Sequence, residues 1–384
     1  MRKILIVSSE FPPGPGGIGT HAYQLSRHLA RLNWQVLVVA PQDYVSPQER
    51  EAFNSSQPFA IHSLSRSGWR MLTAGYRLGE IWKCIRLYSP QAVIFSGEKM
   101  VWLAGVLKPF FRMAFLAVGH GTEFGKITGW QARITRWAFH RMDHLIAVSQ
   151  YTRAKMETLG ILSDRITVIP NGADEERFFP LPEKRLSSLR AKFNGNQSPI
   201  LLTVGNVTDR KGQEVVIRAL PKILSRFSDA QYWMVGLPTL RDKLEQVASE
   251  LKVQDHVHFL GRLGNSELVE AYNACDIFIM ASREMPDGDV EGFGIAILEA
   301  ALCGKPSIGT LGTGTSEAIF HGYTGLLVPQ NDPTALASAV ISLLENKEYS
   351  RQLGQNAYHY VMAHATWEKR VLEYHHLLLQ LLPQ

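Results

Sequence analysis

Short runs of apolar residues recur along the chain and alternate with longer segments of helical periodicity. The first run is Lys-Ile-Leu-Ile-Val-Ser at residues 3–8, and similar runs lie at 36–40, 92–95, 114–118 and 144–148. Runs of this length without polar alternation are typical of strands buried on both faces of a parallel sheet. Because these strands alternate with helical segments, the pattern predicts a doubly wound α/β architecture.

The same alternation resumes in the second half of the chain. Strands are expected at residues 200–204, 232–235, 257–260, 277–280 and 326–328. The stretch 180–198 holds Pro180, Pro182 and Gly195, and it is interpreted as a linker. A length of 384 residues also favours two domains. We therefore expect two parallel-sheet domains joined near this stretch.

Composition indicates an ordinary globular protein, with 45% hydrophobic and 20% charged residues. Cys84, Cys275 and Cys303 have neither metal-binding nor disulfide spacing, so a reducing compartment is expected. The N-terminal residues lack a signal-peptide pattern, and no apolar run reaches the ~20 residues that a transmembrane helix needs. These features favour a cytoplasmic protein.

Positive charge is concentrated in the first half, where residues 1–180 carry a formal charge of +8 against −3 for the remainder. Basic and aromatic residues are mixed in three segments, 66–86, 108–112 and 126–141. One interpretation is solvated helix faces with aromatic residues in the core. The other is a surface that contacts anionic lipid head groups, at the inner face of the cell membrane. Nucleic acid is not expected, because no recognised nucleic-acid module is present.

The segment 288–304 carries the most specific chemistry. Glu291 and Glu299 flank Gly-Phe-Gly at 292–294, and an apolar run predicts a helix that begins near Ile295. The free amides at such a helix start suit a phosphate. A carboxylate one turn deeper is a good acceptor for ribose hydroxyls. Two surface glutamates are the alternative, but the glycines and the apolar surroundings argue against it.

Three further loops contain candidate ligand-binding residues. Residues 14–19 match Gly-x-Gly-x-x-Gly, which makes a nicotinamide cofactor a hypothesis; however, Glu-Phe-Pro-Pro precedes the first glycine and no acidic residue ends the next strand. Arg210 and Lys211 stand at a strand-to-helix junction and suit a diphosphate, or form an exposed basic turn. Residues 309–316 are interpreted as another glycine-rich loop.

The motif Glu291-Gly-Phe-Gly-x4-Glu299-Ala, followed by Gly-Lys-Pro at 304–306, resembles that of the family 4 retaining glycosyltransferases. Those enzymes have the GT-B fold, two Rossmann-like domains that face a cleft, and a C-terminal helix that crosses back to the first domain. The resemblance implies an acceptor-binding domain at 1–180 plus 366–384. It implies a nucleotide-sugar-binding domain at 195–365.

The resemblance also implies roles for individual residues at strand ends and in glycine loops. Catalytic roles are implied for His120 and Glu291. Contacts to the donor diphosphate are implied for Gly17, Arg210, Lys211, Phe293 and Gly294. Contacts to the nucleoside are implied for Leu260, Arg262 and Glu299. Contacts to the acceptor are implied for Gly16 and Glu123. No metal is expected, and Asp287-x-Asp289 is interpreted as a polar loop. Asn206 stands where many family members have arginine, and Arg210 is the hypothetical substitute.

The predicted activity is transfer of a hexose from a nucleoside diphosphate sugar, with UDP-glucose favoured, to an acceptor hydroxyl with retention. The expected acceptor is a lipid-linked saccharide used in cell-surface polysaccharide synthesis. Two alternatives from other enzyme classes remain: a nucleotide-sugar epimerase of related fold, and an NAD-dependent oxidoreductase that uses the first glycine loop. A catalytically inactive sugar-binding protein is disfavoured by the presence of both glutamates and Lys211.

Overall fold

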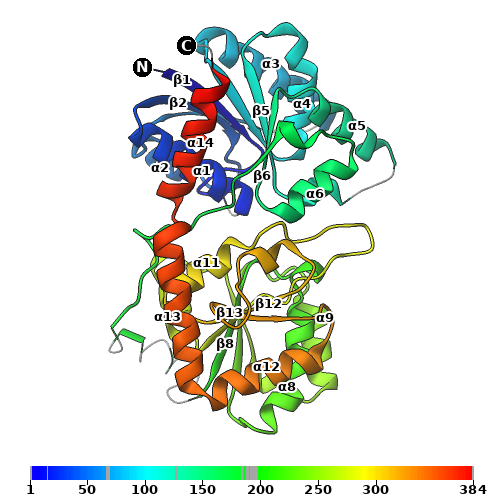
Figure 1. Ribbon diagram of the computed structural model, residues 1–384, viewed down its shortest axis with the longest axis vertical. Helices are drawn as coiled ribbons and strands as arrows, with labels where there is room; N and C mark the ends of the chain where they lie inside the picture. The colour runs from blue at the N-terminus through cyan, green and yellow to red at the C-terminus, as the bar shows by residue number, and fades with distance from the viewer. Residues whose placement is uncertain are drawn as a thin grey trace. The chain divides into compact units, whose positions relative to one another are not determined.

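The computed structural model describes residues 2–14, 16–65, 70–125, 129–182, 185–186, 190 and 198–382. The chain forms two compact units (Figure 1): a first unit of Met1–Asn171 with Trp367–Gln384, and a second unit of Gly172–Thr366. Residues 172–180, predicted in the first domain, lie in the second unit, where Phe178 packs edge-on against Tyr272 at 5.5 Å between centroids and Asn273 donates to the Phe179 carbonyl at 3.0 Å. Most of the expected linker lies outside the described residues.

The first unit is built on a seven-stranded sheet in which every neighbouring pair of strands is parallel. The strands in sequence order are β1 (Arg2–Ser8), β2 (Trp34–Pro41), β3 (Ala60–Leu64), β4 (Ala92–Ser96), β5 (Ala114–Gly119), β6 (His144–Ala147) and β7 (Ile166–Val168). Their order in the sheet is β3-β2-β1-β4-β5-β6-β7. The order reverses between β1 and β4, and open α/β sheets bind ligands at the carboxyl ends of strands at such a point.

The described part of the first unit contains the helices α1 (Gly17–Arg31), α2 (Pro47–Ser55), α3 (Arg70–Tyr88), α4 (Glu98–Leu107), α5 (Gly129–His140), α6 (Gln150–Thr158) and α14 (Trp367–Leu381). Leu5 and Val7 of β1 face a core that includes α3, α4 and α5. Ile4 and Ile6 point to the opposite face because side chains alternate along a strand. On that face α1 packs on β1 and β2 and against α14.

The second unit has a six-stranded sheet, again parallel throughout, with the order β10-β9-β8-β11-β12-β13. Its strands are β8 (Ile200–Val204), β9 (Gln231–Val235), β10 (Val257–Gly261), β11 (Ile277–Ile279), β12 (Ser307–Thr310) and β13 (Gly325–Val328). The order reverses between β8 and β11. The expectation that residues 309–316 are entirely loop is therefore wrong at its start, because β12 includes residues 309–310 and lies between β11 and β13.

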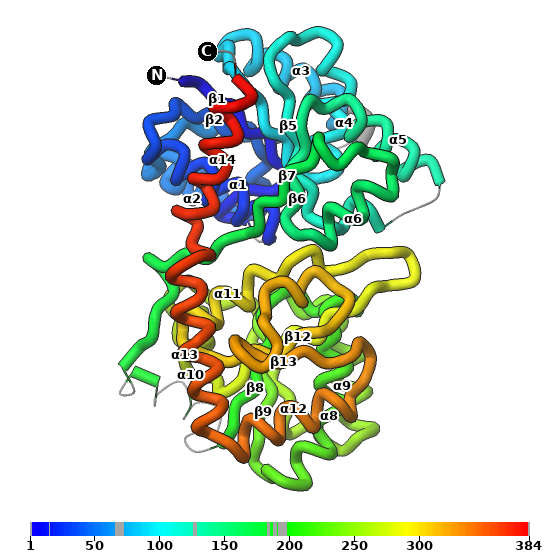
Figure 2. The backbone as a smooth tube through the Cα atoms, in the orientation of Figure 1, coloured from blue at the N-terminus to red at the C-terminus, as the bar shows by residue number. Residues whose placement is uncertain are grey.

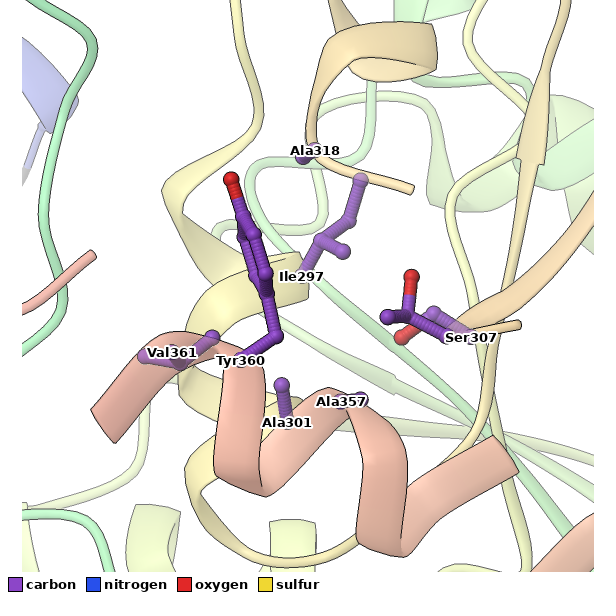
Figure 3. A pocket seen from close by; sticks show the side chains of 8 residues that line it. Ile297, Ala301, Ser307, Ala318, Ala357, Tyr360 and Val361 are labelled. Carbon is purple, nitrogen blue, oxygen red and sulfur yellow. The ribbon is translucent and has the colours of Figure 1, made fainter. Parts of the chain in front are cut away.

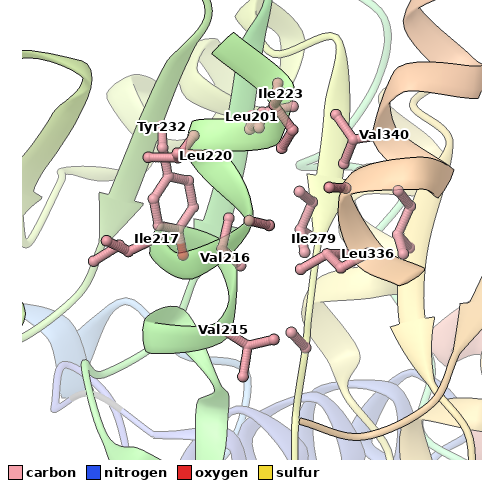
Figure 4. Close-up of a cluster of buried hydrophobic side chains, with 14 of the residues drawn as sticks. Leu201, Val215, Val216, Ile217, Leu220, Ile223, Tyr232, Ile279, Leu336 and Val340 are labelled. Atoms are coloured by element: carbon pink, nitrogen blue, oxygen red, sulfur yellow. The ribbon is translucent and has the colours of Figure 1, made fainter. Parts of the chain in front are cut away.

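The second unit contains the helices α8 (Gln213–Leu224), α9 (Arg241–Glu250), α10 (Asn265–Ala274), α11 (Ile295–Leu302), α12 (Pro333–Glu345) and α13 (Lys347–His364). Apolar side chains of α8 and α12 pack over β8, β9 and β11, and Figure 4 shows Leu201, Leu220, Ile279 and Leu336 among them. The chain trace in Figure 2 shows that α13, which ends the second unit, is followed directly by α14 of the first.

Candidate functional site

Three charged side chains meet at the carboxyl ends of β8 and β11. Lys211 Nζ lies 2.5 Å from Glu291 Oε2, and Arg210 Nη1 lies 2.5 Å from the same oxygen. Arg210 Nε also lies 3.3 Å from Asp289 Oδ2. The side chains of Lys211 and Glu291 are 14% and 16% exposed, so these ion pairs are largely shielded from solvent. The structure thus brings together two predicted phosphate-binding cations and the first glutamate of the motif.

Backbone packing explains why these loops meet. Arg210 and Lys211 belong to the short 3-10 helix η4 (Asp209–Lys211), which precedes Gly212. Gly212 has φ +71°, and a Cβ there would overlap the carbonyl oxygen of Ala281. Arg283 then donates its backbone N–H to the Arg210 carbonyl at 2.9 Å. The loop after β8 is therefore held against the loop after β11.

Electrostatics keep Glu291 ionised. Burial alone raises the pKa of a carboxyl group, but Lys211 and Arg210 outweigh it and lower the pKa of Glu291 to about 2. Burial lowers the pKa of Arg210, because it disfavours the charged guanidinium. The neighbouring Glu291 and Asp289 outweigh this effect and raise the pKa of Arg210 above its ordinary value. Glu291 is therefore a permanent anion at neutral pH, and it neutralises part of the positive charge of the two cations.

Helix α11 begins directly beside this ion cluster. Its N-cap is Gly294, with φ +92°, and no side chain caps the helix or places a carboxylate in its first turn. The backbone N–H of Gly314 donates to the carbonyl of Glu291 at 3.0 Å, which fixes the loop that enters the helix. The amides at an uncapped helix N-terminus attract anions, so phosphate binding at this position stays a prediction that the geometry suits.

Glu299 is held by a residue that sequence reasoning missed. The hydroxyl of the fully buried Tyr272, on α10, donates to Glu299 Oε2 at 2.6 Å. Burial raises the pKa of Glu299, and this hydrogen bond partly opposes the shift. Nothing in the sequence signals the pairing. Leu260 is half-buried at the end of β10 and Arg262 is exposed; among the described residues neither forms a hydrogen bond or ion pair with Glu299.

The opposite face of α11 contributes to packing. Figure 3 shows a small gap lined by Ile297, Ala301, Ala357 and Tyr360, between α11 and α13. Ile297 and Ala301 lie one helical turn apart on the same face, whereas Glu299 points to the opposite face. Apart from Ser307, Thr324 and the hydroxyl of Tyr360 the lining is apolar, which is typical of a small packing gap in the core.

In the first unit, His120 follows β5 as predicted and is anchored by residues from other strands and helices. Its Nε2 lies 2.8 Å from Ser96 Oγ at the end of β4, and its ring packs edge-on against His21 at 5.1 Å between centroids. His21 Nε2 in turn lies 2.9 Å from the hydroxyl of Tyr374 on α14. Burial lowers the pKa of His120 to about 4, so its imidazole is neutral at physiological pH.

Two carboxyl groups lie close to His120 and to Gly16. Glu123 Oε2 accepts the backbone N–H of His120 at 3.0 Å. Burial raises the pKa of Glu10, which follows β1, and a hydrogen bond from the backbone N–H of Gly19 partly opposes this shift. Glu10 lies so close to Gly16 that a Cβ at Gly16 would overlap its Oε2, whereas a Cβ at Gly17 would meet open space.

Family models cover both units. A model described as Glycosyltransferase Family 4 matches residues 15–177, and one described as Glycosyl transferases group 1 matches residues 187–360. The chain belongs to glycosyltransferase family 4. The oxidoreductase and epimerase hypotheses are not favoured by these matches.

Similar proteins agree with this assignment. This glycosyltransferase is 29% identical over 385 residues, 96% of each chain, to the GDP-mannose-dependent alpha-(1-6)-phosphatidylinositol monomannoside mannosyltransferase of Mycolicibacterium smegmatis. It is similar in structure to sucrose-phosphate synthase from Thermosynechococcus elongatus, with TM-score 0.82, 23% identity and 99% of each chain covered. It also resembles Anabaena Alr3699/HepE in complex with UDP and glucose, with TM-score 0.84, 19% identity, and 99% and 100% covered. The fold is GT-B, as predicted.

Asn206, which stands where many family members have arginine, has a structural role in this glycosyltransferase. Asn206 Oδ1 accepts the backbone N–H of Leu237 at 3.3 Å, so this side chain connects the loops after β8 and β9. Arg210 lies beside Lys211 on the shared carboxylate of Glu291. Of the predicted Asp287-x-Asp289 pair, Asp289 contacts Arg210 and Asp287 accepts the N–H of Asp289.

Part of the predicted basic and aromatic surface of this glycosyltransferase lies on α5. Arg133, Arg136, Trp137, His140 and Arg141 line a shallow concavity. Trp130 is 63% exposed and Trp137 is stacked under Arg141, 4.7 Å from its guanidinium. In the described part of the chain, no helix has the length and apolarity needed to cross a membrane. Other members of the predicted surface lie outside the described residues: Arg66, Trp69 and Lys126, together with the side chain of Arg70.

Glu123→Gln is expected to make stability less dependent on pH. Burial raises the pKa of Glu123 to about 7 from its ordinary 4.5. The unfolded chain therefore releases the Glu123 proton at a lower pH than the folded chain does. As a result, the free energy of unfolding falls as pH rises from about 4.5 to 7. Between pH 5 and pH 8 the free energy of unfolding of the variant should rise by about 2–3 kcal/mol relative to that of the wild type. Urea unfolding at both pH values measures this, and a difference that does not change with pH would contradict it.

Proposed function

We propose that the protein transfers a hexose from a nucleoside diphosphate sugar to an acceptor hydroxyl, with retention of configuration. The observation that carries this proposal is the cluster of Arg210, Lys211 and Glu291 beside the uncapped N-terminus of α11. Two cations and the start of a helix that no side chain caps suit a diphosphate, which needs both charge and hydrogen-bond donors.

The donor diphosphate replaces Glu291 as the partner of the two cations. Lys211 and Arg210 then neutralise the charge that develops on the leaving phosphate as the bond between sugar C1 and the phosphate oxygen breaks. The amides at Phe293 and Gly294 contribute further donors. Glu291, released from the cations, lies near the sugar hydroxyls and balances the positive charge that develops on the ring.

The acceptor oxygen forms its bond to C1 on the face that the phosphate leaves. The departing phosphate oxygen takes the acceptor proton, so no separate base is required. His120, neutral and anchored by Ser96, contacts the reacting sugar, while Gly16 and Glu123 contact the acceptor. Gly17 remains a prediction for the diphosphate. We propose no metal requirement, so EDTA should leave the rate unchanged, and the anomeric proton coupling of the product should report retention.

The nucleoside is proposed to bind along α11 and the end of β10. Glu299 accepts hydrogen bonds from the ribose through the carboxylate oxygen that Tyr272 leaves free, and Leu260 and Arg262 border the base. UDP-glucose is the donor expected on frequency alone. The M. smegmatis relative is described as GDP-mannose-dependent, so GDP-mannose is the second donor to test.

Nucleotides should stabilise the protein selectively. A ligand at 100 times its Kd raises the free energy of unfolding by about 2.7 kcal/mol. We expect UDP or GDP, but not NAD or NADP, to raise Tm, and Glu299→Gln to abolish most of the rise. Tyr272→Phe should weaken nucleotide binding about tenfold, since a misoriented carboxylate loses roughly one hydrogen bond to a charged group. Stabilisation by NAD or NADP alone would overturn the proposal and direct attention to the first glycine loop.

We propose further that α5 contacts anionic lipid, where a lipid-linked saccharide acceptor would be found. Among the described residues Arg133 and Arg136 form no ion pair with a carboxylate, and exposed Trp130 and Trp137 flank them. Indole and arginine side chains together suit the interface between head groups and acyl chains.

Flotation with vesicles tests this contact. The wild type should float with vesicles that contain anionic lipid at low salt, because each basic residue near such a surface contributes about 1 kcal/mol. Arg133→Glu/Arg136→Glu should lower the bound fraction at least tenfold. Lys347→Glu/Arg351→Glu, the same change of charge on α13, should have little effect. Equal flotation of both variants would exclude α5 as the contact surface.

A further inference from the structure

We propose that the acceptor group received by the first unit is an uncharged sugar, and that Glu10 and Glu98 exclude phosphorylated sugars from it. This inference rests on the proposed function, because it identifies the substrate class that the acceptor residues recognise. Its basis is the set of carboxyl groups that follow the same strand ends as His120 and its neighbours.

Three glutamates follow the carboxyl ends of three adjacent strands. Glu10 follows β1, Glu98 follows β4 and Glu123 follows β5, and these strands are neighbours in the order β1-β4-β5. Glu98 Oε1 accepts a hydrogen bond from Thr135 Oγ1 at 3.0 Å, and its charge acts on Glu123. Glu10 lies against Gly16.

Glu123 carries an unused hydrogen-bond acceptor. Its side chain is only 5% exposed, its Oε2 accepts the N–H of His120, and its Oε1 has no hydrogen-bond partner among the described residues. A buried polar oxygen without a partner is costly, and a sugar hydroxyl, which can both donate and accept, supplies the partner for either protonation state of Glu123. This atom points to a ligand independently of the clustering of carboxyl groups.

Positive charge is scarce in the same place. His120 and the buried His21 are both held neutral by burial, which lowers their pKa values. In the described segments 9–14, 16–19, 97–101 and 120–125, which follow β1, β4 and β5, the one lysine or arginine is Lys99, and it is exposed. A phosphate is usually bound by arginine, lysine or free helix amides. At the start of α1 the amide of Gly19 already donates to Glu10, and Gly17 is assigned to the donor diphosphate and not to the acceptor.

The consequence for specificity is a difference between sugars and their phosphates. Sugar hydroxyls donate hydrogen bonds to carboxylates, whereas a sugar phosphate brings about two negative charges towards them. Like charges roughly 6 Å apart at an effective dielectric constant of about 20 repel enough to lower affinity about 100-fold. Glu10 and Glu98 are thus specificity residues whose negative charge is the discriminating feature.

The experiment compares methyl α-mannoside and methyl α-glucoside with the corresponding 6-phosphates. The donor is UDP-glucose if UDP raises Tm, and GDP-mannose if GDP does. Transfer from this donor is measured as kcat/KM, and acceptor binding is measured by saturation-transfer NMR with the same nucleotide present. The wild type should prefer the uncharged glycosides by about 100-fold or more. Glu10→Gln and Glu98→Gln should each reduce this preference about tenfold. Glu51→Gln, which removes an exposed carboxylate from α2 of the same unit, should not.

Different outcomes overturn different statements. Equal or better use of the 6-phosphates, or a preference that neither Gln variant changes, would overturn the inference. So would a nucleotide-stabilised protein that binds no uncharged glycoside. In each of these cases the proposed function survives because the nucleotide response is intact. Loss of both the nucleotide response and all transfer would overturn the proposed function as well.

Discussion

Lys211→Met is expected to lower kcat/KM by about 10³-fold, since removal of one preorganised donor to a developing anion costs about 10²–10³ and Lys211 also carries a full charge. Lys211 Nζ lies 2.5 Å from Glu291 in a site only about one-sixth exposed. Methionine keeps the length and the apolar stem of lysine, so the change removes mainly the charge. Initial rates over a range of donor concentrations measure the loss.

The stability of the variant should fall much less than its activity. Removal of one partner from a buried ion pair costs about 3–5 kcal/mol when the remaining charge is unpaired. Glu291 keeps Arg210 as a partner, so about 1–2 kcal/mol is expected. Because the pKa of Glu291 lies near 2 and below its ordinary value, the ion pair stabilises the fold at neutral pH. That contribution is lost as pH falls through about 2.

Lys243→Met is the matched control. Lys243 contacts Asp209 and Glu214 beside the same loop, and its side chain is 48% exposed. The Lys243→Met change removes the same charge as Lys211→Met, but next to the site and not in it. Exposed ion pairs contribute about 1 kcal/mol or less to stability. The rate should stay within about threefold of the wild type. Equal losses in the two variants would show that general positive charge matters and not the Lys211 contact.

Gly314→Ala is expected to lower the free energy of unfolding by about 1–3 kcal/mol and the rate by at least about 100-fold. Gly314 lies in the 3-10 helix η6 (Gly314–Glu317). A Cβ there would overlap the carbonyl group of Gly292 and lie 2.7 Å from the carbonyl oxygen of Glu291. Both neighbours are backbone, so the loop must move, and Glu291 moves with it.

Gly79→Ala is the control for the added methyl group. Gly79 is an exposed helical residue of α3 with no atom within 4 Å of the new Cβ. Alanine there should raise stability by up to about 1 kcal/mol through its higher helix propensity. Urea unfolding and initial rates of both variants measure the effects. Full activity in Gly314→Ala would show that the position of Glu291 does not depend on this contact.

Local sequence was sufficient for the elements with a strong apolar pattern. The strand expected at 200–204 is β8 with the same bounds, and the helix start expected at Ile295 is the first residue of α11. These elements combine a continuous apolar run with a nearby glycine, so local composition alone specifies them. Strand β12 was missed because Ser-Ile-Gly-Thr holds a single large apolar side chain. It is a strand because β11 and β13 lie on either side and pair with it.

The sequence by itself determined the fold class, the two-domain organisation and the motif residues, because the repeating strand pattern and the Glu-x7-Glu spacing are local properties. Tertiary structure alone decided which side chains hold those residues. Tyr272 reaches Glu299 from another helix, and Tyr374 reaches His21 across 353 positions of sequence. Contacts between residues so distant in sequence depend on strand order and helix packing, and local composition does not encode either.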